Sequence, residues 1–330
     1  MSTPGDDRAW PVRGGLRRAE VWLVGSLAAM IALATLAGGL AGGEAVLGYL
    51  ARLDAGLLAG LLALSLVNYL ARLLRWQLFA RALGLHAVGL AEGGLYYVAG
   101  FAMGVTPGKI GEALRLWLLR RRAGYRYHRT SAMLVADRLT DMVAMLALCG
   151  VGLFAFPDFL WTALPLAVAV AALVAAIAWP APMLRTIGAL YGRVRRWPRL
   201  FAGLRRALRH ARECITGPTL PLVLVLSLVG WLAEAVALWW LLAALGADVG
   251  LLAAIFVFAF ATFAGVATML PGGLGGVEAG MIGLLTLLHV DLATAIVVTV
   301  VIRVTTLWFA VGLGFLALPV ALRRSATGNG

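Results

Sequence analysis

Long apolar stretches alternate with short basic segments along almost the whole chain. A helix needs about 20 apolar residues to cross the hydrocarbon core of a bilayer. Six stretches reach that length, and we predict a membrane-spanning helix for each: residues 20–42, 55–80, 130–156, 159–180, 217–246 and 292–318. The first is longer than the apolar core of a signal peptide, so we expect it to be retained as a span.

Two further apolar regions, 90–122 and 250–289, are each interrupted near the middle by Pro-Gly. Proline removes a backbone donor and glycine accepts positive φ, so a helix is expected to stop at each break. Each region is too short for two comfortable full spans. We therefore predict helical hairpins that enter the membrane and return, with the broken backbone buried in protein or lining a cavity.

The arginines gather in alternate connecting segments. If the N-terminus is cytoplasmic, the segments on the other side carry a single basic residue, Arg52. The cytoplasmic segments are then 1–19, 81–89, 120–129, 181–216 and 319–330. This asymmetry follows the positive-inside rule. It predicts a multi-pass protein of the bacterial inner membrane with both termini in the cytoplasm.

The two broken regions belong to a wider internal repeat. In each copy a glutamate follows Pro-Gly and an arginine follows at nearly the same spacing: Glu112 with Arg138, and Glu278 with Arg303. The repeated unit is a span, a broken hairpin and a further span. Three crossings separate the starts of the two copies, so they are expected to have opposite orientation.

The predicted fold class is thus an all-α polytopic membrane protein, with about six full spans plus two re-entrant hairpins (8–10 membrane helices) arranged as an inverted repeat. We expect one membrane domain, 1–330. Its parts are an N-terminal tail and first span (1–54), repeat 1 (55–156), a linking span and basic cytoplasmic stretch (157–216), repeat 2 (217–320) and a cytoplasmic tail (321–330).

The composition supports this fold class and limits the kinds of partner that we expect. The chain is 62% hydrophobic and 13% charged, and its formal net charge is +13. A nucleic-acid partner is not expected, because the basic clusters lie between apolar spans and are better placed to contact anionic lipid. The four histidines are scattered and the two cysteines have no metal-ligand spacing, so we expect no metal and no cofactor.

Each Pro-Gly break is a candidate anion site. The helix that starts after it would place free N–H groups and a positive dipole end near mid-membrane, beside Lys109 in the first copy. The alternative is a tight turn that only packs against its neighbours. Two opposed copies favour the functional interpretation, because facing half-helix ends near the midplane form substrate sites in transporters.

Glu112 and Glu278 fall in the first turns of these half-helices. A helix dipole stabilises such an acid by about 0.3–1 kcal/mol, whereas burial in a membrane costs about 2.5–3.5 kcal/mol. A partner or a wet cavity is therefore needed. We predict the pairs Glu112–Arg138 and Glu278–Arg303, or the crossed pairs. The arginines either form structural ion pairs or bind phosphate, for which a guanidinium is well suited.

Other polar residues lie within the predicted spans. Asp141 follows Arg138 by three positions, so the two can share a helix face. Arg72 and Arg75 are secondary candidates, and Arg75 could snorkel to the cytoplasmic surface. For Glu234 two roles stay open, a structural pair with an arginine and a place in the lining of a cavity. The basic stretch 185–212 has interleaved apolar residues and is either an amphipathic surface segment or a solvated loop.

An ordered set of motifs resembles a known family, the transmembrane region of lysylphosphatidylglycerol synthases, also described as a flippase-like or UPF-type membrane family. The motifs are Arg75-Trp76 with Ala82-Leu83-Gly84, Pro107 to Arg115, Asp137-Arg138-Leu139-Thr140-Asp141, and Pro271 to Gly275 with Glu278. The resemblance covers about residues 20–320, and the second Pro-Gly motif has a longer spacing than expected. It implies translocation of an aminoacylated or other lipid between leaflets, by a standalone form without the soluble synthase domain.

The leading hypothesis is therefore transbilayer movement of an anionic or aminoacylated lipid headgroup, without enzymatic activity. The alternatives are a non-catalytic membrane partner of a lipid-synthesising enzyme and a membrane enzyme acting on a lipid-phosphate. The expected partners are phosphate-containing membrane lipids. The candidate binding residues are Pro107, Gly108, Lys109, Glu112, Arg138, Asp141, Pro271, Gly272, Glu278 and Arg303, with Arg72, Arg75 and Glu234 secondary.

Overall fold

The computed structural model describes residues 53–106, 110–178, 213–214, 219–268 and 270–326, with four isolated positions nearer the N-terminus. The predicted span 20–42 except for Gly25, the whole basic stretch 185–212 and the segment Pro107-Gly108-Lys109 lie outside the described residues. Throughout the described ranges, every regular element is a helix.

Four helices of the described chain are long and apolar enough to cross a membrane, which confirms an all-α, multi-pass membrane protein. They are α3 (Ala55–Ala82), α6 (Tyr127–Gly152), α10 (Thr219–Ala244), and α13 (Leu292–Arg303), which continues through a π-helix (Val304–Trp308) into α14 (Phe309–Ala326). The predicted span 159–180 corresponds to η5 (Pro157–Thr162) and to the 16-residue helix α7 (Ala163–Ala178), which packs against α6. A short turn, η4 (Leu153–Ala155), joins α6 to this pair.

Both predicted hairpins consist of helical parts that lie on either side of a Pro-Gly position. The first comprises α4 (Leu90–Ala99), η2 (Gly100–Met103) and α5 (Ile110–Ala123); the second comprises α11 (Leu251–Ala267), η6 (Pro271–Gly273) and α12 (Gly276–Leu287). At the second break, Gly272 and Gly273 have φ of 61° and 67°. That left-handed backbone is accessible to glycine at little steric cost, which explains why the helix ends there.

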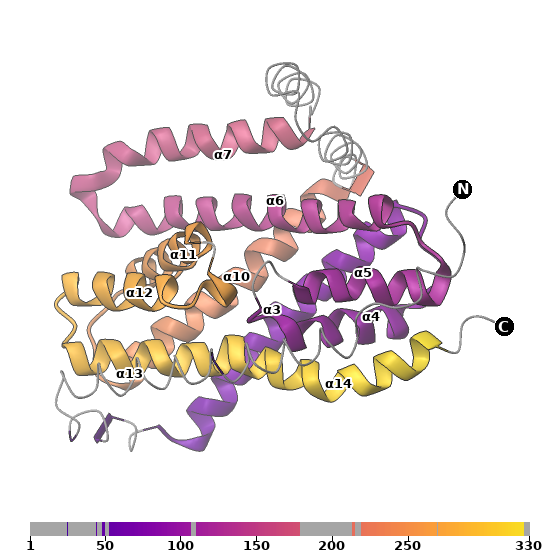
Figure 1. The fold of residues 1–330 in the computed structure, drawn as a ribbon. Coiled ribbons are helices and arrows are strands. Elements are labelled where there is room, and N and C mark those ends of the chain that lie inside the picture. Colours follow the sequence, from indigo (N-terminus) through magenta and orange to yellow (C-terminus); the bar gives the residue numbers. More distant parts are fainter. Residues whose placement is uncertain are drawn as a thin grey trace.

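The corresponding helices of the two halves run in opposite directions. Figure 1 shows α3 antiparallel to α10, and α6 antiparallel to α13 and α14. The contacts between halves are reciprocal as well: α6 packs against α11, and α14 packs against α4 and η2. Each half thus lays its last helix against the hairpin of the other half, as expected for two inverted repeats.

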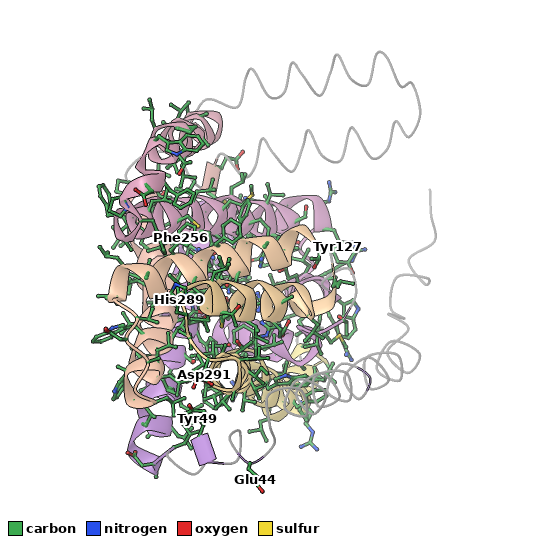
Figure 2. All side chains as sticks on the ribbon, turned by 90° about the vertical axis from the view of Figure 1, so that its left-hand side faces the viewer. Glu44, Tyr49, Tyr127, Phe256, His289 and Asp291 are labelled. Carbon is green, nitrogen blue, oxygen red and sulfur yellow. The ribbon has the colours of Figure 1, made fainter. Side chains whose placement is uncertain are left out.

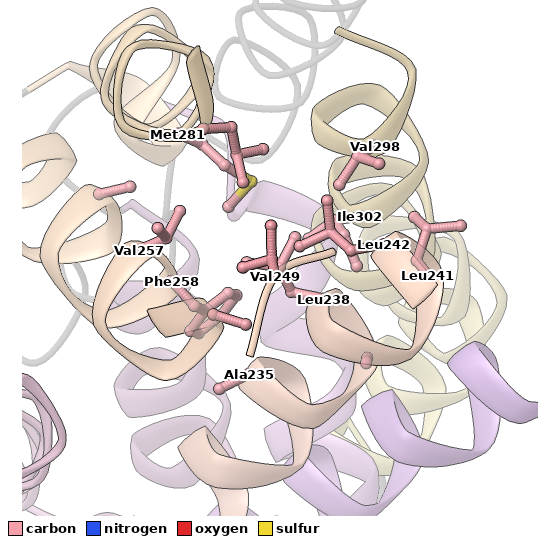
Figure 3. Close-up of a cluster of buried hydrophobic side chains, with 14 of the residues drawn as sticks. Ala235, Leu238, Leu241, Leu242, Val249, Val257, Phe258, Met281, Val298 and Ile302 are labelled. Carbon is pink, nitrogen blue, oxygen red and sulfur yellow. The ribbon is translucent and has the colours of Figure 1, made fainter. Parts of the chain in front are cut away.

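Two apolar cores flank the centre of the molecule. One lies around α11, α12 and α13 with the ends of α3 and α6 that face them, and includes Leu238, Phe258 and Met281 (Figure 3). The other lies around α4, α5 and α14 and includes Trp76 and Tyr96. Because α3 and α6 contribute to both cores, the middle of these helices lies between them, and the charged residues of the fold gather there.

Aspartates fix where two of the long helices begin. Asp54 caps α3 by accepting the backbone N–H of Leu57 at 2.6 Å. Asp291 caps α13 by accepting the backbone N–H of Thr294 at 2.9 Å, and the hydroxyl of Tyr49 donates to it at 3.3 Å (Figure 2). Partial burial opposes ionisation of Asp291, but these hydrogen bonds prevail and lower the pKa of its carboxyl below the usual value.

Candidate functional site

An ionic cluster joins α3 to α6 at the centre of the first half. The guanidinium of Arg75 is fully buried, and it bridges the carboxylates of Asp137 and Asp141. Its Nη1 lies 2.8 Å from Oδ1 of Asp141, and it also donates to the hydroxyl of Ser227 on α10. Arg72, one turn earlier on α3, donates to Asp141 at 3.2 Å.

Arg138 and Glu112 form the open edge of this cluster. Arg138 Nη2 lies 2.5 Å from Oε1 of Glu112, which sits in the first turn of α5, and 3.2 Å from Oδ2 of Asp137. The side chains of Arg138 and Glu112 are 34% and 19% exposed. This pair is therefore accessible from outside the protein, whereas the Arg75 bridge is not.

Three arginines and three carboxylates make up the cluster, so its formal charge is balanced: Arg72, Arg75 and Arg138 against Glu112, Asp137 and Asp141. Trp231 of α10 ties the second half to it. Its indole N–H donates to Asp141 at 3.0 Å, and its ring lies 5.1 Å from the Arg72 guanidinium. Buried charges are tolerated only when paired and hydrogen-bonded, and this arrangement meets that condition.

The second half contains a smaller and more deeply buried pair. Arg303 Nε lies 2.6 Å from Oε1 of Glu278, and the two side chains are 10% and 5% exposed. Arg303 also donates from Nη2 to the carbonyl of Gly272 at 2.7 Å, so it binds the hairpin break itself. The other oxygen of Glu278 is buried and has no hydrogen-bond partner among the described residues.

The two hairpin breaks meet at the centre of the fold. A Cβ built on Gly272, in the second break, would lie 3.5 Å from Cγ1 of Val105, just before the first break. It would also lie 3.4 Å from Leu307 in the π-helix that follows Arg303. Helix α5 begins just beyond the first break and helix α12 just beyond the second. Each has a glutamate in its first turn.

The structure confirms both predicted pairs, Glu112–Arg138 and Glu278–Arg303, and does not form the crossed pairs. Arg138 and Asp141 share a face of α6, with 3.7 Å between Nη1 and Oδ2. The snorkelling interpretation of Arg75 is wrong, because two aspartates on the neighbouring helix hold it in the interior. Pro271 begins η6, whereas Pro107, Gly108 and Lys109 lie outside the described residues.

Glu234 is buried on α10, and it forms neither a hydrogen bond nor an ion pair within the described chain. Of the two roles left open for it, the structural pair with an arginine is therefore not formed. Arg72 and Arg303 are nevertheless close enough to act on its charge electrostatically, as is Asp141. The helix that carries it, α10, packs against α3 and α6, which hold most of the ionic cluster, and against α13, which holds Arg303.

Two residues of the site, Asp137 and Arg115, belong to the quoted sequence motifs but were not among the candidate binding residues. Asp137 is buried and contacts three arginines; its signal is the spacing to Asp141, which places both carboxylates on one face of a helix. Arg115 is 5% exposed and lies over the ring of Tyr97, 3.9 Å from its centroid, while its Nε donates to the Tyr97 carbonyl at 3.0 Å. The sequence feature that could have identified Arg115 is that it stands alone among apolar residues in the first turns of α5.

Chemically, the site offers guanidinium groups and helix N-termini, both of which bind phosphate oxygens. Its carboxylates compensate the arginines and can accept a cationic group. Within the described ranges, no cluster of histidine, cysteine and acidic residues could hold a metal ion. The arrangement thus suits reversible binding of a charged group.

Comparison with known proteins places these features in a family. The family model described as "Lysylphosphatidylglycerol synthase TM region" matches residues 22–314. Two proteins of Methanothermobacter thermautotrophicus, each named "UPF0104 membrane protein", align with part of the chain. One is 30% identical over 118 residues (36% of this chain and 35% of the relative), and the other is 33% identical over 94 residues (28% of each). The alignments thus span about a third of these relatives.

Proposed function

The chain belongs to the lysylphosphatidylglycerol synthase transmembrane-region family, and from this membership and the geometry of the site we propose that it moves a phosphate-containing lipid headgroup between the leaflets of a membrane. One observation carries the proposal. Two oppositely directed halves bring their broken hairpins together at the centre, and behind each break lies an arginine–glutamate pair. Facing half-helix ends at mid-depth are the geometry of a transport site.

In this proposal the headgroup sits between the hairpin breaks and the acyl chains stay in the surrounding lipid. On one side the phosphate oxygens replace the carboxylate of Glu112 as the partner of Arg138. On the other side they replace the carboxylate of Glu278 as the partner of Arg303. Because both glutamates have an arginine partner before the lipid arrives, no uncompensated charge is exposed to the apolar interior. A cationic group on the headgroup would be accepted by the glutamate that the phosphate displaces.

The different burial of the two pairs supports alternating access. The Glu112–Arg138 pair is half-open, at 19% and 34% exposure, while Glu278–Arg303 is closed, at 5% and 10%. Two inverted halves can exchange these environments by rocking against each other. The structure then corresponds to the state in which the first-half pair receives a headgroup.

We further infer the orientation and location from the arginine asymmetry. With both termini in the cytoplasm, the first hairpin enters from the cytoplasmic face of a cytoplasmic membrane. The half-open pair then faces the cytoplasmic leaflet, where a newly made lipid would arrive.

The decisive experiment uses purified full-length protein in proteoliposomes that contain a trace of fluorescently labelled phosphatidylglycerol. Chemical quenching of the outer leaflet measures how fast labelled lipid arrives from the inner leaflet. We expect faster arrival than in protein-free vesicles, with lipid chemically unchanged. Altered lipid recovered from protein in detergent would instead select a membrane enzyme. No movement, with stable co-purification of a lipid-synthesising enzyme, would select a non-catalytic partner.

A further inference from the structure

Glu234 differs from the other acids inside the fold. Among the acidic residues that the structure describes within the long helices and hairpins, it is the one without an arginine within 4.0 Å. It is 6% exposed and lies in the middle of α10. A charged carboxylate at such a place costs about 2.5–3.5 kcal/mol by insertion scales, so the balance between its charged and neutral forms depends on the charges nearby.

The charged and titratable groups around Glu234 come from three helices packed against α10. Arg72 and Tyr69 lie on α3, Asp141 lies on α6 and Arg303 lies on α13. The fourth neighbour, α11, carries no titratable residue. Both arginines are already bound to carboxylates, and the Tyr69 hydroxyl donates to the carbonyl of Thr306 in the π-helix. None of these groups forms an ion pair or a hydrogen bond with Glu234 in the described chain.

A second, independent observation indicates that the α3–α10 interface is polar. Asn68 is 1% exposed, and neither its amide nitrogen nor its amide oxygen has a hydrogen-bond partner among the described residues. A Cβ built on Gly230 would lie 3.3 Å from the Asn68 nitrogen, so this amide faces α10 one turn before Glu234. Buried amide groups without partners are uncommon in native folds, and strain, a functional role, or a bound water or ion accounts for those that occur.

Resting on the function proposed above, we infer that Glu234 takes up a proton when an anionic headgroup binds between the hairpin breaks and releases it when the headgroup leaves. The headgroup would add negative charge next to Arg303 on α13, a helix that packs against α10 and so lies beside the helix of Glu234. Like charge favours the protonated acid, and by linkage the protonated acid favours the anion. One lipid anion and one proton would then cross together, without net charge movement.

The transport test imposes a pH difference across proteoliposomes that contain labelled phosphatidylglycerol. With one proton per lipid, a difference of one pH unit is expected to hold about tenfold more labelled lipid in the leaflet on the alkaline side. E234Q should still move lipid without a gradient but show no gradient-driven enrichment. D248N, in an exposed loop between α10 and α11, should behave as wild type. If the wild-type protein moved labelled lipid without enriching it on the alkaline side, the inference would be overturned and the proposed function would stand.

A chemical test does not depend on transport. Dicyclohexylcarbodiimide adds to protonated, membrane-embedded carboxyl groups, and mass spectrometry locates the adduct. We expect modification at Glu234, more in vesicles with phosphatidylglycerol than in purely zwitterionic ones, and little at Glu278, whose carboxylate forms an ion pair with Arg303. An unmodified Glu234, or modification indifferent to anionic lipid, would refute the coupling. That result would stand even if no lipid movement were found.

Discussion

The two arginine–glutamate pairs should differ sharply in what they contribute to stability. Glu278→Gln leaves Arg303 without its carboxylate in a site where the two side chains are only 5% and 10% exposed. Breaking a buried pair by removing one partner costs about 3–5 kcal/mol. Glu112→Gln makes the same chemical change beside Arg138, which is 34% exposed and keeps Asp137 and Asp141 as partners. That change should cost about 0–1 kcal/mol.

Equilibrium unfolding of both variants in one detergent–lipid mixture measures the difference. A double-mutant cycle with Arg303→Gln isolates the pair itself, and the double variant should recover part of the loss because no unpaired charge remains. The matching cycle at Glu112 and Arg138 should give a coupling below about 1 kcal/mol. Equal losses for Glu278→Gln and Glu112→Gln, or a larger loss for the latter, would refute the burial argument.

Three further predictions concern packing, ionic geometry and helix capping. Gly314→Ala should lower the free energy of unfolding by about 1–3 kcal/mol, because the new Cβ would overlap the backbone nitrogen of Ala102. Gly312→Ala on the same helix is the control: its Cβ meets nothing within 4 Å, so the protein should keep its stability. Arg75→Lys should lower the unfolding midpoint even though charge is kept, because an ammonium cannot replace the fork that binds two aspartates and a hydroxyl, and each unmet partner costs about 1–3 kcal/mol. Asp291→Ala should cost about 0.5–2 kcal/mol through the lost cap of α13, measurable by the same unfolding assay, and no loss would contradict the cap.

Much of the fold could be read from the chain because few alternatives exist in a bilayer. Apolar length alone located the four long helices, since backbone groups in lipid must be satisfied within a helix. At the second break the Pro-Gly dipeptide located the end of the helix for a local reason, the lost donor and the left-handed backbone at Gly272. The pairs Glu112–Arg138 and Glu278–Arg303 were predictable because an acid in an apolar segment needs a partner and the repeat offered one at a matching position.

What sequence reasoning could not supply is which charge meets which across helices. Arg75 lies near the end of its span and could as well have reached the surface; its partners, Asp137 and Asp141, come from α6, and only tertiary packing brings them together. Glu234 posed the opposite problem. Arg72 and Arg303 come from helices packed against α10, but each is paired with another carboxylate. The order of residues in the sequence does not show which carboxylate each arginine will bind.

The most direct test of the central claim is the rate at which labelled phosphatidylglycerol crosses the bilayer of proteoliposomes holding wild type, Arg303→Ala or Glu112→Gln. If a headgroup passes between the two breaks, both variants should lose at least about tenfold in rate, as expected for one charge-assisted hydrogen bond. Size-exclusion profiles and helical circular dichroism should remain those of the wild type, and D248N should retain its rate. Wild-type rates in both variants would contradict the account.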